Sequence, residues 1–323
     1  MIGYDYWTEH VIRFTKEFGA ALEIDHCELT VSDYSQNYPQ EIFSVIQMPT
    51  HYLVFLNLHA NLILSNQNLF KDIGNFENEK LNKENFNVRN YLLDIKTFLE
   101  TNKDFWDTFP NDERRNKYAG LLRDLMTYFT IYHEIGHIRQ KNYPAQTIRQ
   151  EIGVTENKEE TKWAEQIEEV DADIFAIKFL WRTVFYNFHQ FRPNSTLTST
   201  KELLSLSLYS TFLFFYLSDN DEELNNPLKE HPHPIVRFSI VADDLQKIVE
   251  LNELCNKQDF NKIVQSVLRE FDSTLTYHFK STDNKSYYDK FYSPEVAKVR
   301  SKLQTCISLD PSLNFNRPYT LSQ

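Results

Sequence analysis

The stretch from Tyr128 to Gln140 reads YFTIYHEIGHIRQ and contains an H-E-x-x-H motif between His133 and His137. Histidines four residues apart lie one above the other on the same face of an α-helix. Two imidazoles in this arrangement can bind one Zn²⁺ at about 2.0 to 2.1 Å each, and the glutamate after the first histidine can act as a base toward water. The stretch therefore predicts His133 and His137 as metal ligands and Glu134 as a catalytic base.

Apolar residues recur around the motif at near-helical spacing, which predicts a buried helix over about residues 112–141. Gly136 should lower the stability of that helix by roughly 1 kcal/mol relative to alanine. A glycine at this position makes sense if another backbone or side chain must approach closely. The alternative interpretation of the motif is coincidence, so the prediction of a metal site requires a third ligand.

An acidic cluster, EEVDAD, runs from Glu168 to Asp173 within a long helix expected over residues 161–187. Glu169 and Asp173 share one face of that helix. Glu169 would be the third protein ligand and leave the fourth zinc position open, and Asp173 would accept the ring N–H of a ligating histidine. Because the flanking residues are apolar, we expect the cluster to enter the core, where an uncompensated carboxylate is costly. An ordinary acidic helix is the alternative interpretation.

Composition and charge exclude several classes of function. The 323-residue chain has a formal charge of −12, which argues against nucleic acid or an anionic membrane as a partner. Its three cysteines are far apart and form no C-x-x-C pair, so no disulfide framework is indicated. The N-terminus lacks a signal-peptide pattern, and the most apolar run, Leu203 to Leu217, is too short and too hydroxylated to span a membrane. We expect a cytoplasmic protein without a membrane span.

The fold class follows from mainly helical periodicity. Besides the two motif helices, we expect helices over residues 6–22, 58–70, 88–100, 203–217, 234–251, 259–279 and 293–307. Two short runs rich in β-favouring residues, Ile42 to Gln47 and His51 to Asn57, are expected to form a small sheet. With no repeat or linker, the sequence predicts one α+β, predominantly α-helical domain over residues 1–323, with a core of about residues 42–255 and helical extensions at both ends.

H-E-x-x-H followed on a second helix by E-x-x-x-D, here Glu169 to Asp173, resembles the gluzincin metallopeptidases. The form E-x-x-A-D is similar to the CAAX prenyl endopeptidases and their relatives, including the phage-exclusion peptidases. E-x-x-A-x-x-F-A also resembles small intracellular zinc peptidases that cleave repressors of mobile elements. The resemblance implies a zincin-like core, with His133, His137 and Glu169 as zinc ligands and Glu134 as the base. The membrane helices of the prenyl endopeptidases have no counterpart here, so a lipidated substrate is not implied.

A later element agrees with this resemblance. Those families carry an H-P with an arginine six residues after the histidine, and this chain has His231 before a proline and Arg237 at that offset. The resemblance implies that His231 binds substrate and stabilises the oxyanion and that Arg237 orders the carboxylates. His233 is an alternative to His231 for this role. The His-Pro pair could instead simply mark the start of a helix, and Arg237 could be a surface cation. Tyr52 to Asn57 also resembles the strand that precedes the active helix and offers its edge to a peptide, with an interior strand as the alternative.

Together these features predict a zinc-dependent endopeptidase, a hydrolase that acts on a protein or peptide inside the cell. Its substrate, exact family and oligomeric state are not specified by the motifs. Glu134 would accept a proton from the attacking water and pass it to the leaving amine. The alternative is a non-catalytic, zinc-stabilised regulatory or binding protein on a zincin scaffold. The presence of Glu134 weighs against this alternative, because a structural zinc site needs ligands but no base.

Overall fold

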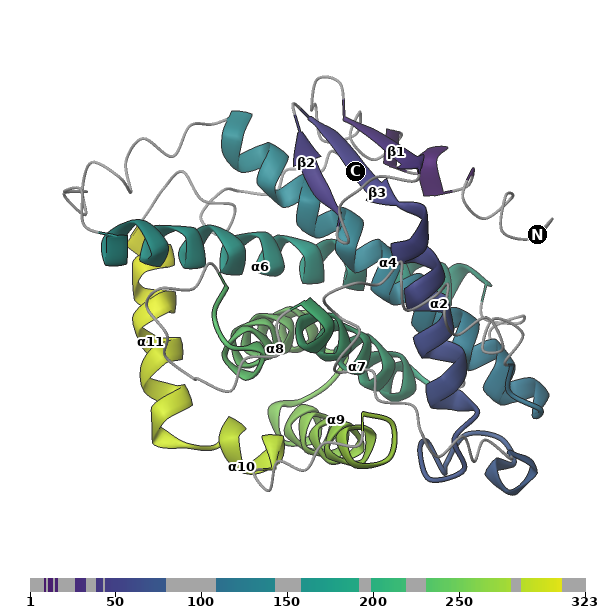
Figure 1. The fold of residues 1–323 in the computed structure, drawn as a ribbon. Coiled ribbons are helices and arrows are strands. Elements are labelled where there is room, and N and C mark those ends of the chain that lie inside the picture. Colours follow the sequence, from purple (N-terminus) through teal and green to yellow (C-terminus); the bar gives the residue numbers. More distant parts are fainter. Residues whose placement is uncertain are drawn as a thin grey trace.

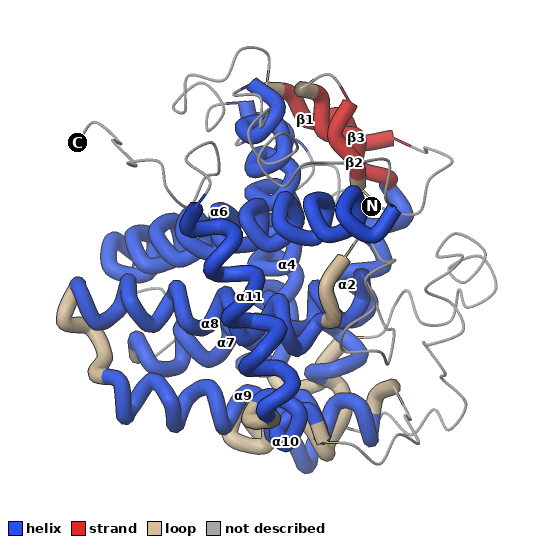
Figure 2. Tube along the Cα trace, turned by 90° about the vertical axis from the view of Figure 1, so that its left-hand side faces the viewer, coloured by secondary structure: helices blue, strands red, loops and turns tan. Residues whose placement is uncertain are grey.

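The computed structural model describes residues 9, 11–13, 15–16, 27–32, 39–42, 44–79, 109–142, 158–191, 199–218, 231–279 and 286–309. Within them, a small sheet lies at one end of a mainly helical body (Figures 1 and 2). The helices are α2 (Thr50–Leu64), η1 (Phe76–Asn78, a 3-10 helix), α4 (Glu113–Asn142), α6 (Lys158–Phe191), α7 (Thr200–Ser218), α8 (Pro234–Leu251), α9 (Lys257–Tyr277), α10 (Tyr287–Phe291) and α11 (Pro294–Leu309). The predicted α+β class with mainly helical content is confirmed.

Most predicted helices that fall within the described residues are present. The helices expected over 112–141, 161–187, 203–217, 234–251, 259–279 and 293–307 correspond to α4, α6, α7, α8, α9 and α11, with ends shifted by a few residues. The helix expected over 6–22 lies mostly outside the described residues, and the helix expected over 88–100 lies entirely outside them. The helix expected over 58–70 is the second half of α2, which ends at Leu64.

The sheet has three strands in the order β1-β3-β2. They are β1 (Glu28–Ser32), β2 (Gln40–Ile42) and β3 (Val45–Pro49), and β3 pairs parallel with β1 and antiparallel with β2. The run from Ile42 to Gln47, predicted as a single strand, is therefore divided between β2 and β3. The chain reverses between them, where Ser44 has a φ of 66°. The sequence analysis did not predict β1.

The prediction of a strand at His51 to Asn57 was wrong, because these residues form the first half of α2. The helix begins at Thr50, directly after Pro49 ends β3. Most side chains of α2 are buried, so its apolar run reflects a helix surrounded by protein. A short apolar run does not distinguish a buried strand from a buried helix. The peptide-binding edge expected at Tyr52 to Asn57 is overturned with the strand.

Helix α4 is the element around which the other helices are arranged. It packs against α2, α6 and α7 and touches strands β2 and β3 of the sheet. Helix α6 packs against α8, and α7 packs against both α8 and α9. In Figure 1, α6 crosses α4, and α7, α8 and α9 lie below this crossing. The two helices that carry the motifs are therefore in direct contact.

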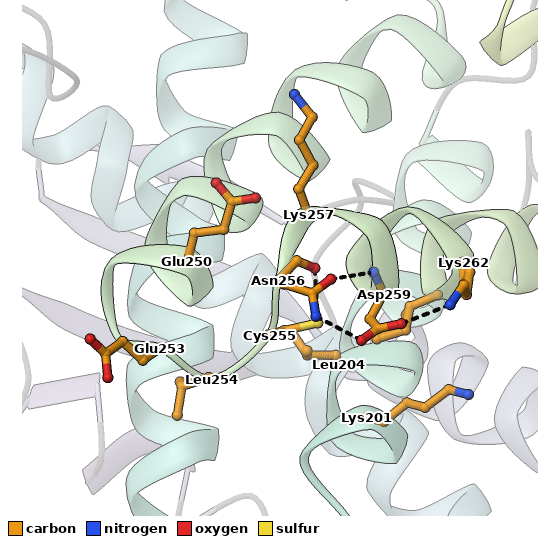
Figure 3. Close-up of a pocket in the computed structure, with 11 residues that line it drawn as sticks. Lys201, Leu204, Glu250, Glu253, Leu254, Cys255, Asn256, Lys257, Asp259 and Lys262 are labelled. Carbon is orange, nitrogen blue, oxygen red and sulfur yellow. Dashed lines mark hydrogen bonds and ion pairs between the residues drawn. The ribbon is translucent and has the colours of Figure 1, made fainter.

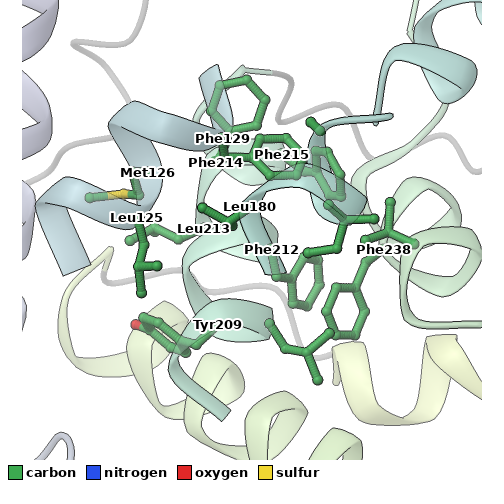
Figure 4. Packing of buried hydrophobic residues seen from close by; sticks show 14 of the residues in the cluster. Leu125, Met126, Phe129, Leu180, Tyr209, Phe212, Leu213, Phe214, Phe215 and Phe238 are labelled. Atoms are coloured by element: carbon green, nitrogen blue, oxygen red, sulfur yellow. The ribbon is translucent and has the colours of Figure 1, made fainter. Parts of the chain in front are cut away.

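Helix α7 carries the aromatic core (Figure 4). Phe212 stacks on Phe238 of α8, with ring centroids 4.4 Å apart, and on Phe271 of α9, with centroids 4.1 Å apart. Phe215 meets Phe129 of α4 edge to face at 5.5 Å. The prediction of a buried core helix at Leu203 to Leu217 is confirmed. In the part of the chain that the structure describes, no helix has both the length and the apolar character that crossing a membrane requires.

Arg115 of α4 fixes the segment that follows α2. Its side chain is fully buried and lies 3.6 Å from a carboxylate oxygen of Glu79. The rigid fork of guanidinium donors suits an array of backbone carbonyls that would otherwise be unsatisfied in the core. Arg115 donates to the carbonyl oxygens of Leu64 (2.6 Å), Phe70 (2.8 Å), Leu69 (2.9 Å), Asn66 (3.0 Å) and Ile73 (3.0 Å).

A buried pair of histidines joins α2 to the end of α9. The Nδ1 atom of His59 lies 2.9 Å from the Nε2 atom of His278. Burial lowers the pKa of His278 to about 3, and burial together with the His278 ring lowers the pKa of His59 well below its ordinary value. Both imidazoles are therefore neutral in the folded protein at neutral pH, and one ring donates a hydrogen bond to the other.

This pair predicts a loss of stability in mild acid. Well above pH 6.5 neither the folded nor the unfolded pair binds protons, so its contribution to stability is complete there. As the pH falls, the unfolded chain binds protons that the folded pair excludes. Between pH 7 and pH 5 the free energy of unfolding should therefore fall by roughly 2 to 4 kcal/mol more in the wild type than in a His59→Leu/His278→Leu variant. Urea unfolding at both pH values measures the difference, in which the titration of other groups cancels; equal pH dependence would contradict the prediction.

Candidate metal centre

The crossing of α4 and α6 is close because Gly136 faces Ala172. A Cβ atom on Gly136 would lie 3.0 Å from the Cα and 3.2 Å from the Cβ of Ala172. Main-chain atoms of a packed helix cannot yield easily, so any larger residue would push the helices apart. The expected reason for a glycine here, close approach by another element, is confirmed. Because Gly136 lies between the two motif histidines and Ala172 lies within the acidic cluster, this contact brings the two motifs together.

Three predicted ligands meet beside this crossing. Potential ligand atoms of His133, His137 and Glu169 all lie within 4.8 Å of one another. The two Nε2 atoms are 3.1 Å apart, and each lies 3.3 Å from a carboxylate oxygen of Glu169. Atoms that bind one ion tetrahedrally at about 2.0 to 2.1 Å are themselves about 3.3 Å apart. The 3.3 Å distances involve both oxygens of Glu169, Oε2 for His133 and Oε1 for His137, so the triangle of three side chains is small enough for them to share one divalent cation.

The unsatisfied atoms of this triangle also fit a cation. Two imidazole nitrogens 3.1 Å apart repel each other if both present lone pairs, unless a proton or a cation lies between them. The Oε2 atom of Glu169 is buried and accepts no hydrogen bond of good geometry within the described residues. A cation between these atoms would bind the lone pairs of all three side chains at once, so the residues present fit a metal ion.

The charges of the site compensate one another without a metal. Burial lowers the pKa of His133, but the carboxylates of Asp173 and Glu169 outweigh it and raise that pKa to about 10. Burial likewise lowers the pKa of His137, but the Glu169 carboxylate outweighs burial and raises that pKa above its ordinary value. Burial raises the pKa of Glu169, but the neighbouring imidazoles hold it well below its usual range. Protons thus supply the positive charge that a metal ion would replace, and metal binding should release them.

Asp173 and Arg237 form a rigid support behind His133. An Oδ1 atom of Asp173 lies 3.0 Å from His133 Nδ1. Arg237 donates from Nε and Nη2 to the two oxygens of Asp173, each at 2.7 Å, and its guanidinium lies over the Phe215 ring at 4.5 Å. Because both charged side chains are buried, the carboxylate has little freedom to move. Asp173 can accept a hydrogen bond from the Nδ1–H group of His133. The lone pair of His133 then lies on Nε2, which faces Glu169, as predicted from the sequence.

Of the two later histidines, His231 reaches the centre. Its Nδ1 atom lies 3.0 Å from Oε2 of Glu169, and 35% of its side chain is exposed. His233 instead caps α8, where its Nδ1 atom accepts a hydrogen bond from the backbone N–H of Ile235 at 3.1 Å. Its ring is buried and stacks on Tyr287 at 5.8 Å. The structure thus gives His233 the helix-punctuation role and places His231 against a candidate ligand.

Glu134 is the residue that the sequence predicts as the base. It follows His133 on α4 and is 9% exposed. Its negative charge contributes to the raised pKa of His137, so the carboxylate lies close enough to act on that imidazole. A buried carboxylate beside a metal centre is in a suitable environment to exchange a proton with water.

Two residues that the sequence analysis missed lie behind His137. The Oε1 atom of Gln140 lies 3.0 Å from His137 Nδ1. The Nε2 atom of Gln140 donates to the backbone carbonyl of Glu168 at 2.8 Å and to Asp171 Oδ2 at 2.9 Å. A signal was present, since Gln140 follows His137 by three positions on one helix face and Asp171 belongs to the acidic cluster.

Two cavities lie away from this centre. The larger, of about 730 Å³, lies where α8 turns into α9 (Figure 3). Its lining lysine Lys262 pairs with Asp259 at 2.9 Å, and Asn256 caps α9. The other, of about 320 Å³, is lined by residues 70–73 and by residues of α4, α7 and α9. Neither of these two cavities is lined by a residue of the candidate metal centre.

Comparison with protein-family models, with curated proteins and with solved structures gives no match for this chain. The interpretation of the centre therefore depends on its own residues and their geometry.

The close crossing predicts opposite effects for two glycines of α4. Gly120→Ala should raise the free energy of unfolding by about 0.5 to 1 kcal/mol, because alanine favours the helix and no atom lies within 4 Å of the new Cβ position. Gly136→Ala should lower it by about 1 kcal/mol or more, because the clash with Ala172 exceeds the same gain. Urea unfolding of both variants measures this; a stabilised Gly136→Ala variant would show that the contact can relax.

Proposed function

We propose that this chain is a zinc-dependent endopeptidase of the gluzincin type. The observation that supports this most strongly is the triangle of His133, His137 and Glu169, whose potential ligand atoms lie within 4.8 Å of one another. Two imidazoles and one carboxylate form the ligand set of many catalytic zinc sites, in which the fourth position is left to water or substrate. A structural zinc site is usually closed by four protein ligands, so the set of three favours catalysis.

The proposed chemistry is hydrolysis of a peptide bond. A zinc ion held by these ligands would supply Lewis acidity and lower the pKa of water. Glu134 would accept one proton from the attacking water and then donate it to the amine that leaves when the C–N bond breaks. Asp173, held by Arg237, would keep His133 in the tautomer that binds metal through Nε2. No further residue of the chain needs to change its protonation state.

His231 is assigned to substrate in this proposal. It is the most exposed side chain of the group, at 35%, and it belongs to the same cluster through its contact with Glu169. An imidazole there could donate a hydrogen bond to the negative charge that develops on the carbonyl oxygen. The substrate would be a protein or peptide in the cytoplasm. The competing function, a zinc-stabilised binding protein without catalysis, predicts a different response to loss of Glu134.

Loss of any ligand should lower metal content. Wild-type protein should carry about one zinc ion per chain, and His133→Ala, His137→Ala or Glu169→Ala should each reduce this, because only three side chains hold the ion. Elemental analysis of purified protein measures the content. Glu168→Ala is the matched control, since it removes a neighbouring carboxylate of the same helix and should retain zinc. A variant of the three that stays fully loaded would exclude that residue from the ligand set.

Replacement of the base separates the two functions. Glu134→Gln should bind zinc as well as the wild type, because the ligands are intact, while peptide cleavage falls by about 10²- to 10⁴-fold. Cleavage can be followed by mass spectrometry with a library of peptides derived from cellular protein. Glu168→Gln serves as the control and should cleave normally. If Glu134→Gln cleaved at the wild-type rate, or if zinc-loaded wild type cleaved no peptide, the binding-protein function would replace the proposed one.

A further inference from the structure

We propose that Gln140 and Asp171 are positioning residues that hold His137 in the tautomer able to bind metal through Nε2. The inference rests on the proposed metal centre, and it does not require that the centre catalyse hydrolysis. It concerns the second ligand histidine, for which the sequence analysis identified no supporting residue. The tautomer of His137 depends on the direction of each hydrogen bond in the chain from His137 through Gln140 to α6.

The direction is set at the α6 end of this chain. Gln140 Nε2 lies between two oxygen acceptors, the carbonyl of Glu168 at 2.8 Å and the carboxylate of Asp171 at 2.9 Å. Only an NH₂ group can satisfy both acceptors, because an amide oxygen there would face two other oxygens. The amide orientation is therefore determined by its surroundings, and its carbonyl oxygen must face His137.

The tautomer of His137 follows from this orientation. An amide oxygen can only accept, so the Nδ1 atom at 3.0 Å must carry a proton. In the neutral ring the lone pair then lies on Nε2, which faces His133 and Glu169. The opposite tautomer would place a proton where a metal ion has to bind and would leave Gln140 Oε1 without its donor. Of the two neutral tautomers, the hydrogen-bond chain from His137 through Gln140 to Asp171 thus favours the one that binds metal once the second proton has left the ring.

Burial makes this chain of hydrogen bonds from His137 through Gln140 to Asp171 effective. Gln140 is 6% exposed and Asp171 is fully buried, so water cannot easily replace either partner. A buried donor or acceptor that loses its partner costs roughly 1 to 3 kcal/mol. Rotation of the Gln140 amide or of the His137 ring would incur that cost, and both groups are therefore confined to one orientation.

The chain from His137 to Asp171 has a counterpart on the other side of the helix crossing, where Asp173 contacts His133. Asp171 and Asp173 flank Ala172, the residue that contacts Gly136, and successive residues of an α-helix point about 100° apart. Asp173 therefore serves His133 on one side of the contact, and Asp171 serves His137 through Gln140 on the other. Asp173 lies directly against its histidine, whereas Asp171 is linked to His137 by the Gln140 side chain.

The decisive variant is Gln140→Met, which keeps the length of the side chain and removes its hydrogen-bonding groups. Zinc affinity should fall about 10- to 100-fold, the usual effect of losing a group that orients a ligand. A competing chelator measures the affinity. The double variant Gln140→Glu/Asp171→Asn reverses the order of carboxylate and amide, so an oxygen still accepts from His137 and an amide donates behind it. Because the Glu168 carbonyl loses its donor in this variant, affinity should recover in part, to a value above that of Gln140→Met.

A spectroscopic readout distinguishes positioning from packing. In zinc-loaded wild type labelled with ¹⁵N-histidine, the Nδ1–H protons of His133 and His137 should both exchange slowly with solvent, because each is bonded to a buried acceptor. Gln140→Met should lose the slow exchange of the His137 proton and keep that of His133, which is the internal control. The double variant should recover the His137 signal.

The outcomes separate this inference from the proposed function. If the wild type binds zinc and Gln140→Met keeps both the affinity and the slowly exchanging His137 proton, Gln140 only fills space and the inference is overturned. A wild type that takes up no zinc would remove the metal centre and the inference together. Zinc-binding protein without peptidase activity, but with the predicted loss in Gln140→Met, would support the inference and contradict the proposed function alone.

Discussion

The contact between Gly136 and Ala172 is the constraint on which the rest of the site depends. Every donor of the candidate metal centre is on α4 or α6, and the separation of these helices sets the distances between donors. Separations of 3.1 to 3.3 Å between potential ligand atoms tolerate little change, because a metal–ligand bond varies by only about 0.2 Å. The absence of one methyl group therefore allows ligands that are 32 or more positions apart in sequence to meet.

Electrostatics then determines the state of the donors. The acidic side chains of α6 supply negative charge to a buried region, and each is compensated by a specific partner: Glu169 by the two imidazoles, Asp173 by Arg237 and Asp171 by Gln140. Buried charge of this kind is costly unless it is paired. The aromatic core supports the arrangement from below, since Phe215 of α7 lies against the Arg237 guanidinium. Packing and charge thus stabilise the same set of orientations.

Much of the site could be predicted because its spacing within each helix is local. The four-residue interval between His133 and His137 places both on one face of any helix, and the same holds for Glu169 and Asp173. Helical periodicity likewise identified α4, α6 and α7 with only small errors at their ends. Local periodicity did not identify the first half of α2, because a helix buried on nearly every side has no polar face to reveal its period.

The sequence by itself determined which side chains share a helix face, and therefore which residues could act together as ligands and base. Only the tertiary structure decided which side chains from different helices meet. It selected His231 rather than His233 as the neighbour of Glu169, and it brought Asp171 to Gln140 behind His137. The physical reason is that backbone geometry sets positions along one helix, whereas the distance between helices depends on the volumes of the side chains packed between them.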